Sequence, residues 1–313
     1  MGQAGGHVPV LYDQVLVWLQ PHPGGWYIDA TLGAGGHAKG ILLASHPDGR
    51  LLGLDADPDA LLHASKVLEP FGDRATLRVA NFRQLGAVAA ALDIREVDGI
   101  LMDLGLSSRQ LDDAERGFSF AQDGPLDMRM DRSRRESAAD LVNTLSEAEL
   151  SDILWQYGEE RHSRRIARAI VAARPLVTTG QLADLVARTV GRREKIHPAT
   201  RTFQALRIAV NEELESLSEA LPKARDLLCP GGRLAVIAFH SLEDRLVKEF
   251  YRQEARACIC PPELPVCVCQ HQATLRVLTS KPVRPSADET ARNPRSRSAR
   301  LRVAERLGQA ATS

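Results

Sequence analysis

The sequence lacks a long apolar run, a net charge and an abundance of cysteine. No run approaches the roughly 20 apolar residues of a membrane-spanning helix, and residues 1–6 lack the basic and apolar regions of a signal peptide. Lys plus Arg and Asp plus Glu both number 40, so the formal net charge is zero. Binding of nucleic acid would therefore depend on local basic patches. We expect a cytoplasmic protein whose five cysteines do not form structural disulfides.

The 313 residues, 44% of them hydrophobic, suit one large domain or one domain with an insertion. Apolar runs alternate with helix-like stretches, which predicts a mostly parallel sheet covered on both faces. Such a pattern is typical of the Rossmann-like α/β class. The expected strands are residues 26–29, 50–55, 75–80, 97–103 and 232–239, with a last strand at 299–303.

More than a hundred residues separate the strands at 97–103 and 232–239. A crossover needs far less chain, so we expect an inserted helical subdomain at 111–208, with 1–110 and 209–313 forming the main domain. Ser146 and Glu149 have the spacing of a capping box. Helices are predicted at 147–157, 159–173 and 180–190, followed by a long helix at 200–221 that Pro222 ends.

A glycine loop follows the first strand, in the order strand, turn and helix. Gly33-Ala34-Gly35-Gly36-His37-Ala38 fits the loose pattern G-x-G-x-x-A, and Asp55 lies twenty residues after Gly35. Both a nicotinamide dinucleotide and S-adenosyl-L-methionine fit this pattern, and an ordinary tight turn is the simplest alternative. Asp29 favours S-adenosyl-L-methionine, because a carboxylate before the glycines suits a sulfonium and an ammonium but repels a pyrophosphate. Asp103 adds a third carboxylate at a strand end.

The residues also resemble the RsmH (MraW) family of bacterial methyltransferases over almost the whole chain. The matching segments are 7–11 (His-Val-Pro-Val-Leu), 35–37, 103–108 (Asp-Leu-Gly-Leu-Ser-Ser), 110–112, 115–120, 124–130, 157–160, 197–205 (His-Pro-Ala-Thr-Arg-Thr-Phe-Gln-Ala), 239–245 and 293–298. The resemblance implies a class I methyltransferase with a mostly parallel seven-stranded sheet. It also implies methyl transfer from S-adenosyl-L-methionine to N4 of a cytidine in the decoding centre of 16S rRNA, in the small ribosomal subunit.

The resemblance places the cofactor contacts on the glycine loop and on several strand ends. They fall on Ala34, Gly35, Gly36, His37, Asp55, Phe82, Asp103 and Gln110. Ala34 replaces an arginine or another residue of some relatives, and its side chain is expected to point outward. For His37 we favour a contact between its backbone and the cofactor. The alternative is that its side chain only packs locally at the start of a helix.

Asp103 is the expected catalytic residue. The lone pair of cytosine N4 is delocalised into the ring, so acceptors aimed at the amino protons can redirect it toward the methyl group. Asp103 and the carbonyl of Leu104 suit this task. Better-known amino methyltransferases carry an aromatic residue at this position to stack on the flipped base, and it is missing here. The candidates that could replace it are Phe118, Phe120 and His240.

His240 and Ser241 have two interpretations. Either side chain could contact the base or accept its proton. Alternatively, Ser241 is the N-cap of a helix with Asp244 three residues later. Both could hold.

Arginines spaced by three and four residues predict one basic helix face. They are Arg161, Arg164, Arg165 and Arg168, with Arg129, Arg132, Arg134 and Arg135 upstream and Arg292, Arg295, Arg297 and Arg300 in the tail. The residues alone favour RNA contact and a solvated face about equally, and the resemblance favours RNA. The tail arginines could instead pair with acids of the main domain.

Cys258, Cys260, Cys267 and Cys269 lie within twelve residues. A tetrahedral zinc ion and reduced, metal-free thiols are equally consistent with this cluster, because the C-x-C spacing is tighter than the usual C-x₂-C. Cys229 stands alone and is expected to pack.

Two other functions remain open from the residues. The first is a nicotinamide-dependent oxidoreductase, and the second is an RNA-binding assembly factor without activity, which the set of strand-end aspartates disfavours. The residues do not fix the oligomeric state, a homodimer included, nor whether naked rRNA or the subunit is the substrate.

Overall fold

The computed structural model describes residues 9–133, 135–191, 196–261, 264 and 266–308. His7 and Val8, which belong to the first matching segment, and Arg134 of the basic set lie outside the described residues. The chain divides into two compact units, Met1–Gly105 with Glu215–Ser313, and Leu106–Leu214. We call these the sheet unit and the helical unit. The helical unit starts five residues before, and ends six residues after, the expected insertion at 111–208.

The sheet unit contains one seven-stranded sheet in the order β3-β2-β1-β4-β5-β7-β6. Its first five strands pair in parallel, and β7 pairs antiparallel with both β5 and β6. The mostly parallel seven-stranded sheet is therefore confirmed. The strands are β1 (Trp26–Asp29), β2 (Arg50–Asp55), β3 (Ala75–Val79), β4 (Val97–Asp103), β5 (Leu228–Ala238), β6 (Leu275–Val277) and β7 (Arg300–Arg306).

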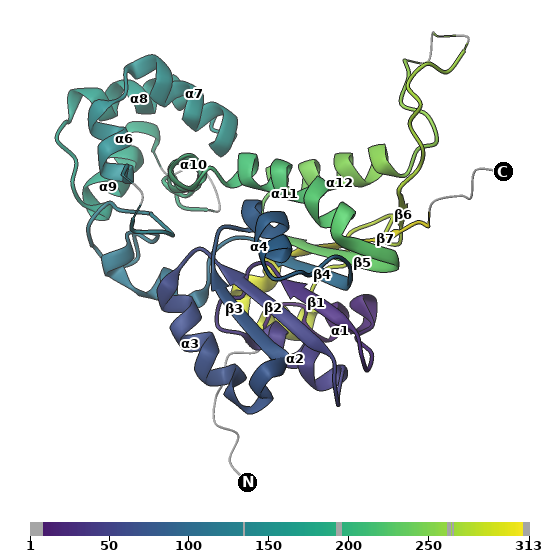
Figure 1. The fold of residues 1–313 in the computed structure, drawn as a ribbon. Coiled ribbons are helices and arrows are strands. Elements are labelled where there is room, and N and C mark those ends of the chain that lie inside the picture. The colour runs from purple at the N-terminus through teal and green to yellow at the C-terminus, as the bar shows by residue number, and fades with distance from the viewer. Residues whose placement is uncertain (1–8, 134, 192–195, 262–263, 265, 309–313) are drawn as a thin grey trace. The chain divides into compact units, whose positions relative to one another are not determined.

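Helices cover both faces of this sheet (Figure 1). Neighbouring residues of one strand enter different apolar clusters, because side chains alternate along a strand. Ile28 belongs to a cluster with Leu217 and Leu221, whereas Tyr27 belongs to a second cluster with Leu19 and Ile41. The helices are α1 (Tyr12–Leu19), α2 (Gly36–Ala44), α3 (Pro58–Leu68), α4 (Leu85–Ala91), most of α11 (Glu213–Leu227), α12 (Ser241–Glu254) and α13 (Ala287–Arg292).

The helical unit has its own apolar core, which includes Leu154, Ile166, Ile170 and Leu206. The predicted capping box is present, since Glu149 accepts hydrogen bonds from the Ser146 backbone N–H (2.8 Å) and hydroxyl (2.7 Å). The helices are α5 (Ser108–Asp112), α6 (Ala138–Thr144), α7 (Glu147–Gly158), α8 (Ser163–Ala172), α9 (Thr179–Val190) and α10 (Thr200–Asn211).

The prediction of one continuous helix at 200–221 is wrong, and so is the prediction that Pro222 ends it. The helix stops at Asn211, because Glu212 adopts a left-handed conformation (φ 49°). The next helix, α11, then runs through Pro222 to Leu227. Burial of Leu217 and Leu221 offsets the lost backbone hydrogen bond at the proline. The helix expected at 159–173 begins at Ser163, since Glu159 caps α7 in a left-handed conformation.

Within the described residues, no helix combines the length and the apolar character that crossing a membrane requires.

Candidate active site

Three aspartates lie at the carboxyl ends of neighbouring parallel strands in the sheet unit. Asp29 ends β1, Asp55 ends β2 and Asp103 ends β4. Asp29 pairs in register with Leu101, so Asp103 lies two residues further along its strand. The chain leaves β1 toward β2 on one side, while β4 lies on the other side. Ligands of open α/β sheets bind at such a switch point.

The glycine loop is held against this edge by its backbone. The Gly33 N–H donates to Asp55 Oδ2 at 2.8 Å. Gly35 has φ +79°, and a Cβ there would lie 3.2 Å from the Ala64 side chain, so the position requires glycine. A Cβ on Gly36 would lie 2.5 Å from the Pro9 ring. The Ala34 side chain is exposed, as expected. The loop therefore presents backbone rather than side chains.

Burial and, to a smaller extent, the charge of Asp55 together raise the pKa of Asp29 to about 7. Burial also raises the pKa of Asp103 well above its usual value, together with the charges of Asp29 and Glu243. Among the described residues, Asp29 Oδ2 and Asp103 Oδ1 are buried without a hydrogen-bond partner. Buried carboxylates without compensation favour a bound cation.

His37 lies beside Asp103 in a neutral state. Its Nε2 is 3.6 Å from Asp103 Oδ2, which is too long for a hydrogen bond. Burial lowers the pKa of the His37 ring to about 4, so the ring stays uncharged near neutral pH. The ring stacks on Tyr12 with centroids 6.1 Å apart. The His37 side chain therefore packs locally at the start of α2, which was one of its two interpretations. A contact between the His37 backbone and the cofactor stays a prediction.

Thr31 and Glu243 belong to the site but were not singled out in the sequence. The Thr31 hydroxyl accepts a hydrogen bond from the Asp103 backbone N–H at 2.6 Å, which ties the end of β4 to the turn after β1. Glu243 is buried and its charge acts on Asp103. The spacing of three residues from His240 to Glu243 is a capping-box signal that could have indicated it.

The expected N-cap at Ser241 is wrong, because His240 is the N-cap of α12. Glu243 Oε2 accepts hydrogen bonds from the backbone N–H groups of Phe239 (2.8 Å) and His240 (3.2 Å). Asp244 instead pairs with Arg302 at 2.6 Å and with Arg300 at 3.1 Å. Arg300 of the tail therefore pairs with an acid of the main domain, as one of the two interpretations expected. The His240 ring is buried beside Glu243, with its Nε2 3.2 Å from Glu243 Oε1.

The remaining two predicted cofactor residues lie in different units. Phe82 follows β3 in a short turn of the sheet unit and is half-buried. The Ala80 N–H donates to the Asp55 carbonyl at 2.8 Å, which places the end of β3 next to Asp55. Gln110 belongs to the helical unit, where its Oε1 accepts a hydrogen bond from the Ser107 N–H at 3.0 Å.

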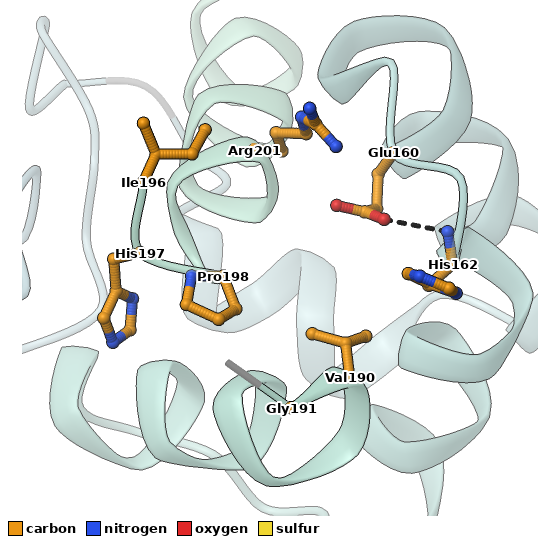
Figure 2. A pocket seen from close by; sticks show the side chains of 8 residues that line it. All are labelled: Glu160, His162, Val190, Gly191, Ile196, His197, Pro198 and Arg201. Atoms are coloured by element: carbon orange, nitrogen blue, oxygen red, sulfur yellow. Dashed lines mark hydrogen bonds between the residues drawn. The ribbon is translucent and has the colours of Figure 1, made fainter. Parts of the chain in front are cut away.

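The helical unit contains a pocket of its own (Figure 2). Arg201 and His197 come from α10 and the segment before it, while Glu160 and His162 come from the connection between α7 and α8. The Glu160 carboxylate is buried and accepts a hydrogen bond from the His162 N–H at 2.8 Å. The pocket collects residues of two matching segments, 157–160 and 197–205, that lie far apart in the sequence.

The predicted basic face of the helical unit is present on α8. Ile166, Ala167 and Ile170 face the core, while the arginines lie exposed. Arg168 pairs with Glu147 at 3.4 Å, and its side chain stays 76% exposed. Arg129, by contrast, forms an ion pair with Asp127 at 2.7 Å, within the unit. Arg164, Arg165 and Arg168 are exposed on this helix, whereas Arg161, predicted to share its face, lies in the turn before it.

The two phenylalanines proposed to hold a base differ in exposure. Phe118 is 6% exposed and belongs to the core of the helical unit. Phe120 is half-buried, with its ring 4.6 Å from His197 and 4.8 Å from Phe203. Its place in that apolar core disfavours Phe118 as a stacking partner. Phe120 and His240 remain candidates, although the His240 side chain is only 9% exposed.

An open parallel sheet with a reversed β7, a glycine loop after β1 and aspartates at the strand ends defines a class I methyltransferase. A family profile described as the MraW methylase family matches residues 4–307. The chain belongs to the MraW methylase family. This membership confirms the resemblance, the enzyme class and the use of S-adenosyl-L-methionine, and it sets the oxidoreductase alternative aside.

Curated relatives match the chain over nearly its full length. A protein of Thermomicrobium roseum is 59% identical over 96% of this chain and 94% of its own length. A protein of Dehalococcoides mccartyi is 53% identical over 97% of this chain and 87% of its own length. A protein of Heliobacterium mobile is 52% identical over 96% of this chain and 99% of its own length. All three are named ribosomal RNA small subunit methyltransferase H.

Proposed function

We propose that this enzyme methylates the exocyclic N4 amine of a cytidine in the decoding centre of 16S rRNA. The names of relatives that are 52 to 59% identical over nearly the whole chain support the rRNA substrate. The observation that carries the chemistry is Asp103, a half-buried carboxylate with one fully buried oxygen and a raised pKa at the end of β4. The resemblance supports the assembled small ribosomal subunit as the substrate. We place the reaction in the cytoplasm, where such subunits are built in bacteria.

The sheet unit supplies what a cationic cofactor requires. Asp29 and Asp103 would face its positive charges, since both have a buried oxygen without a protein partner. Asp55 would hold the ribose hydroxyls and Phe82 would lie beside the adenine, while the loop backbone at Gly35 and Gly36 lines the methionine part. When bound, S-adenosyl-L-methionine supplies an electrophilic methyl group. Ala34, His37 and Gln110 remain predicted contacts that the resemblance carries.

Asp103 would act on the amine. Its carboxylate accepts a hydrogen bond from an N4 proton and turns the nitrogen lone pair away from the ring. When N4 gains the methyl carbon it must lose one proton, and a carboxylate of raised pKa is a better acceptor for it. The cationic donor favours the ionised form of Asp103 before the reaction, which offsets the effect of burial. The Thr31 hydroxyl fixes the Asp103 backbone and thereby positions the carboxylate.

We assign RNA recognition to the helical unit. The exposed arginines on α8 would neutralise phosphates without reading sequence. The pocket around Arg201 and His197 offers a cation and a ring to a nucleotide, with Phe120 packed against that ring. Phe120 and His240 remain the candidates for holding the flipped cytosine, because base extrusion costs a few kcal/mol and needs a stacking partner.

The test is methylation of small subunits from a strain that lacks the enzyme, with the modified nucleoside identified by mass spectrometry. An N4-methylated cytidine in 16S rRNA is the expected product. Naked 16S rRNA should be a poorer substrate than the subunit. Methyl incorporation into another nucleoside, or into a protein, would contradict the proposal. Sedimentation of the purified enzyme would show whether it is a monomer or a homodimer.

A further inference from the structure

Four cysteines converge in the sheet unit, far along the chain from the strand-end aspartates. Cys258, Cys260, Cys267 and Cys269 lie in the connection between α12 and β6, which extends from the sheet unit as a long loop (Figure 1). Their sulfur atoms all lie within 4.8 Å of one another. All four are free thiols, so no disulfide accounts for the cluster.

The spacing of the sulfur atoms matches a single tetrahedral ion. A zinc–sulfur bond of about 2.3 Å in tetrahedral geometry places neighbouring sulfurs about 3.8 Å apart. The Sγ atoms of Cys258 and Cys267 are 3.4 Å apart, those of Cys258 and Cys269 are 3.8 Å apart, and those of Cys267 and Cys269 are 3.6 Å apart. In a [2Fe–2S] or [4Fe–4S] cluster the four cysteines are divided among several iron atoms, and sulfurs on different irons lie farther apart than the 4.8 Å within which all four lie here.

The backbone supports thiolates at these positions. The Ile259 N–H donates to Cys269 Sγ at 3.4 Å, and the Val268 N–H donates to Cys260 Sγ at 3.3 Å. These two bonds place the C-x-C segments side by side. Side chains two residues apart share one face of an extended segment, so each C-x-C turns both sulfurs inward and its middle residue outward. The middle residues Ile259 and Val268 are 40% and 71% exposed. Outer N–H groups of this kind stabilise metal-bound thiolates.

The loop has little apolar burial to hold its shape. Its base is fixed where the Thr274 N–H donates to the Glu254 carbonyl at 2.8 Å. Beyond that base, Leu264, Val266 and Val268 are 46%, 70% and 71% exposed. A segment without a core needs a covalent or metal crosslink to keep a fixed conformation.

We propose that Cys258, Cys260, Cys267 and Cys269 bind one structural Zn²⁺ ion. Four protein ligands close the coordination sphere, which leaves no open position for a substrate or a water molecule. The ion therefore acts on the loop and takes no part in methyl transfer. It crosslinks the two C-x-C segments.

The test is metal analysis of the full chain, expressed with zinc in the medium and purified under reducing conditions without chelator. We expect about one zinc ion per chain in the wild type. In the Cys258→Ser and Cys269→Ser variants, the zinc content should fall at least about tenfold. Cys229→Ser is the matched control, because Cys229 lies outside the cluster, and it should keep its zinc.

A second measurement does not depend on the variants folding. Cobalt in place of zinc should give the intense visible ligand-field bands of a tetrahedral thiolate site. Wild-type protein with a zinc content near zero, with bound iron, or with disulfides detected as a loss of hydrogen mass would overturn the proposal. So would equal zinc in the wild type and the cluster variants. Because the readout is metal content, the result is independent of which RNA the enzyme methylates.

Discussion

The strand-end site of the sheet unit and the α8 surface of the helical unit handle charge in opposite ways. Asp29 and Asp103 are carboxylates whose burial raises their pKa values. Arg164 and Arg165 are exposed cations on a helix whose other face is packed. Buried charge gains strongly from one small partner of opposite sign, whereas exposed charge acts weakly, over distance and in numbers. The first arrangement selects a cofactor, and the second suits a long polyanion.

The largest effect is expected for Asp103→Asn. The amide keeps the shape of the side chain but cannot take the N4 proton, so methyl transfer should fall about 10²- to 10⁴-fold. Titration with S-adenosylhomocysteine, which lacks the sulfonium charge, should show a much smaller loss of binding than of methyl transfer. The control is Asp226→Asn, a side chain 60% exposed on the same unit, which should keep full activity. Near-normal activity of Asp103→Asn would remove the proton-accepting role.

The next effect is on the pH dependence of cofactor binding. Burial raises the Asp29 pKa in the unliganded protein from 3.8 to about 7. A bound cation lowers that pKa again, so binding releases a proton. Affinity for S-adenosyl-L-methionine should therefore rise with pH, by at most about tenfold per unit for one proton, and become flat above about pH 7.

Calorimetry in buffers of different ionisation enthalpy measures this proton release. Asp29→Asn should abolish the part of the pH dependence that ends near pH 7. In the unliganded protein the same group has the opposite consequence for stability. Because its folded pKa is raised, its favourable contribution is complete below 3.8 and is lost as the pH rises through about 7. A pH-independent affinity in the wild type would show that Asp29 does not face the cofactor.

A smaller effect is expected for Gly35→Ala. The left-handed backbone costs about 1–2 kcal/mol for a residue with a side chain, and the new Cβ would press on Ala64 at 3.2 Å. Gly24→Ala is the matched control, since Gly24 has a similar φ of +76° but no atom within 4 Å of a Cβ. Thermal unfolding should show a loss in both variants. Only Gly35→Ala should also weaken cofactor binding, and equal binding by the two would contradict a packed cofactor loop.

The smallest effect is expected for Arg165→Ala on α8. Loss of one phosphate contact should weaken rRNA binding a few-fold and lower the slope of affinity against salt by about 0.7 to 0.9. Arg95→Ala on the sheet unit, with a side chain 86% exposed, provides the charge-matched control. An unchanged salt slope for both variants would indicate that the α8 face is only solvated.

The sequence predicts the strand ends well because they depend on local patterns. Asp29, Asp55 and Asp103 each follow an apolar run, and each ends its strand in the structure. The prediction from sequence fails where a contact between residues far apart in the chain determines the end of a helix. The Asn211 side chain binds the carbonyl of Met128 and the N–H of Met130, both at 2.8 Å, where α10 ends. No property of residues 200–221 alone encodes that partner.

The candidate site shows the same limit. Glycine spacing and strand-end acids indicate the loop and Asp103. The Thr31–Asp103 hydrogen bond, however, joins the turn after β1 to the end of β4 and becomes visible only with the sheet register. The N-cap of α12 shifts from Ser241 to His240 because Glu243, three residues after His240, is the acid that turns back to the backbone. The spacing of the residues is compatible with an N-cap at either position, and tertiary packing decides between them.

The two ends of the described chain are joined beside the glycine loop. Glu289 Oε1 accepts a hydrogen bond from the Leu11 N–H at 2.7 Å, across 278 residues, and Pro9 lies against Gly36. β7, the last strand made, lies between β5 and β6. Because synthesis runs from the N-terminus, a growing chain cannot complete this sheet or fix Leu11 until Glu289 and β7 have left the ribosome. The segment that packs against the glycine loop would thus be held in place only after almost all of the described chain has been made.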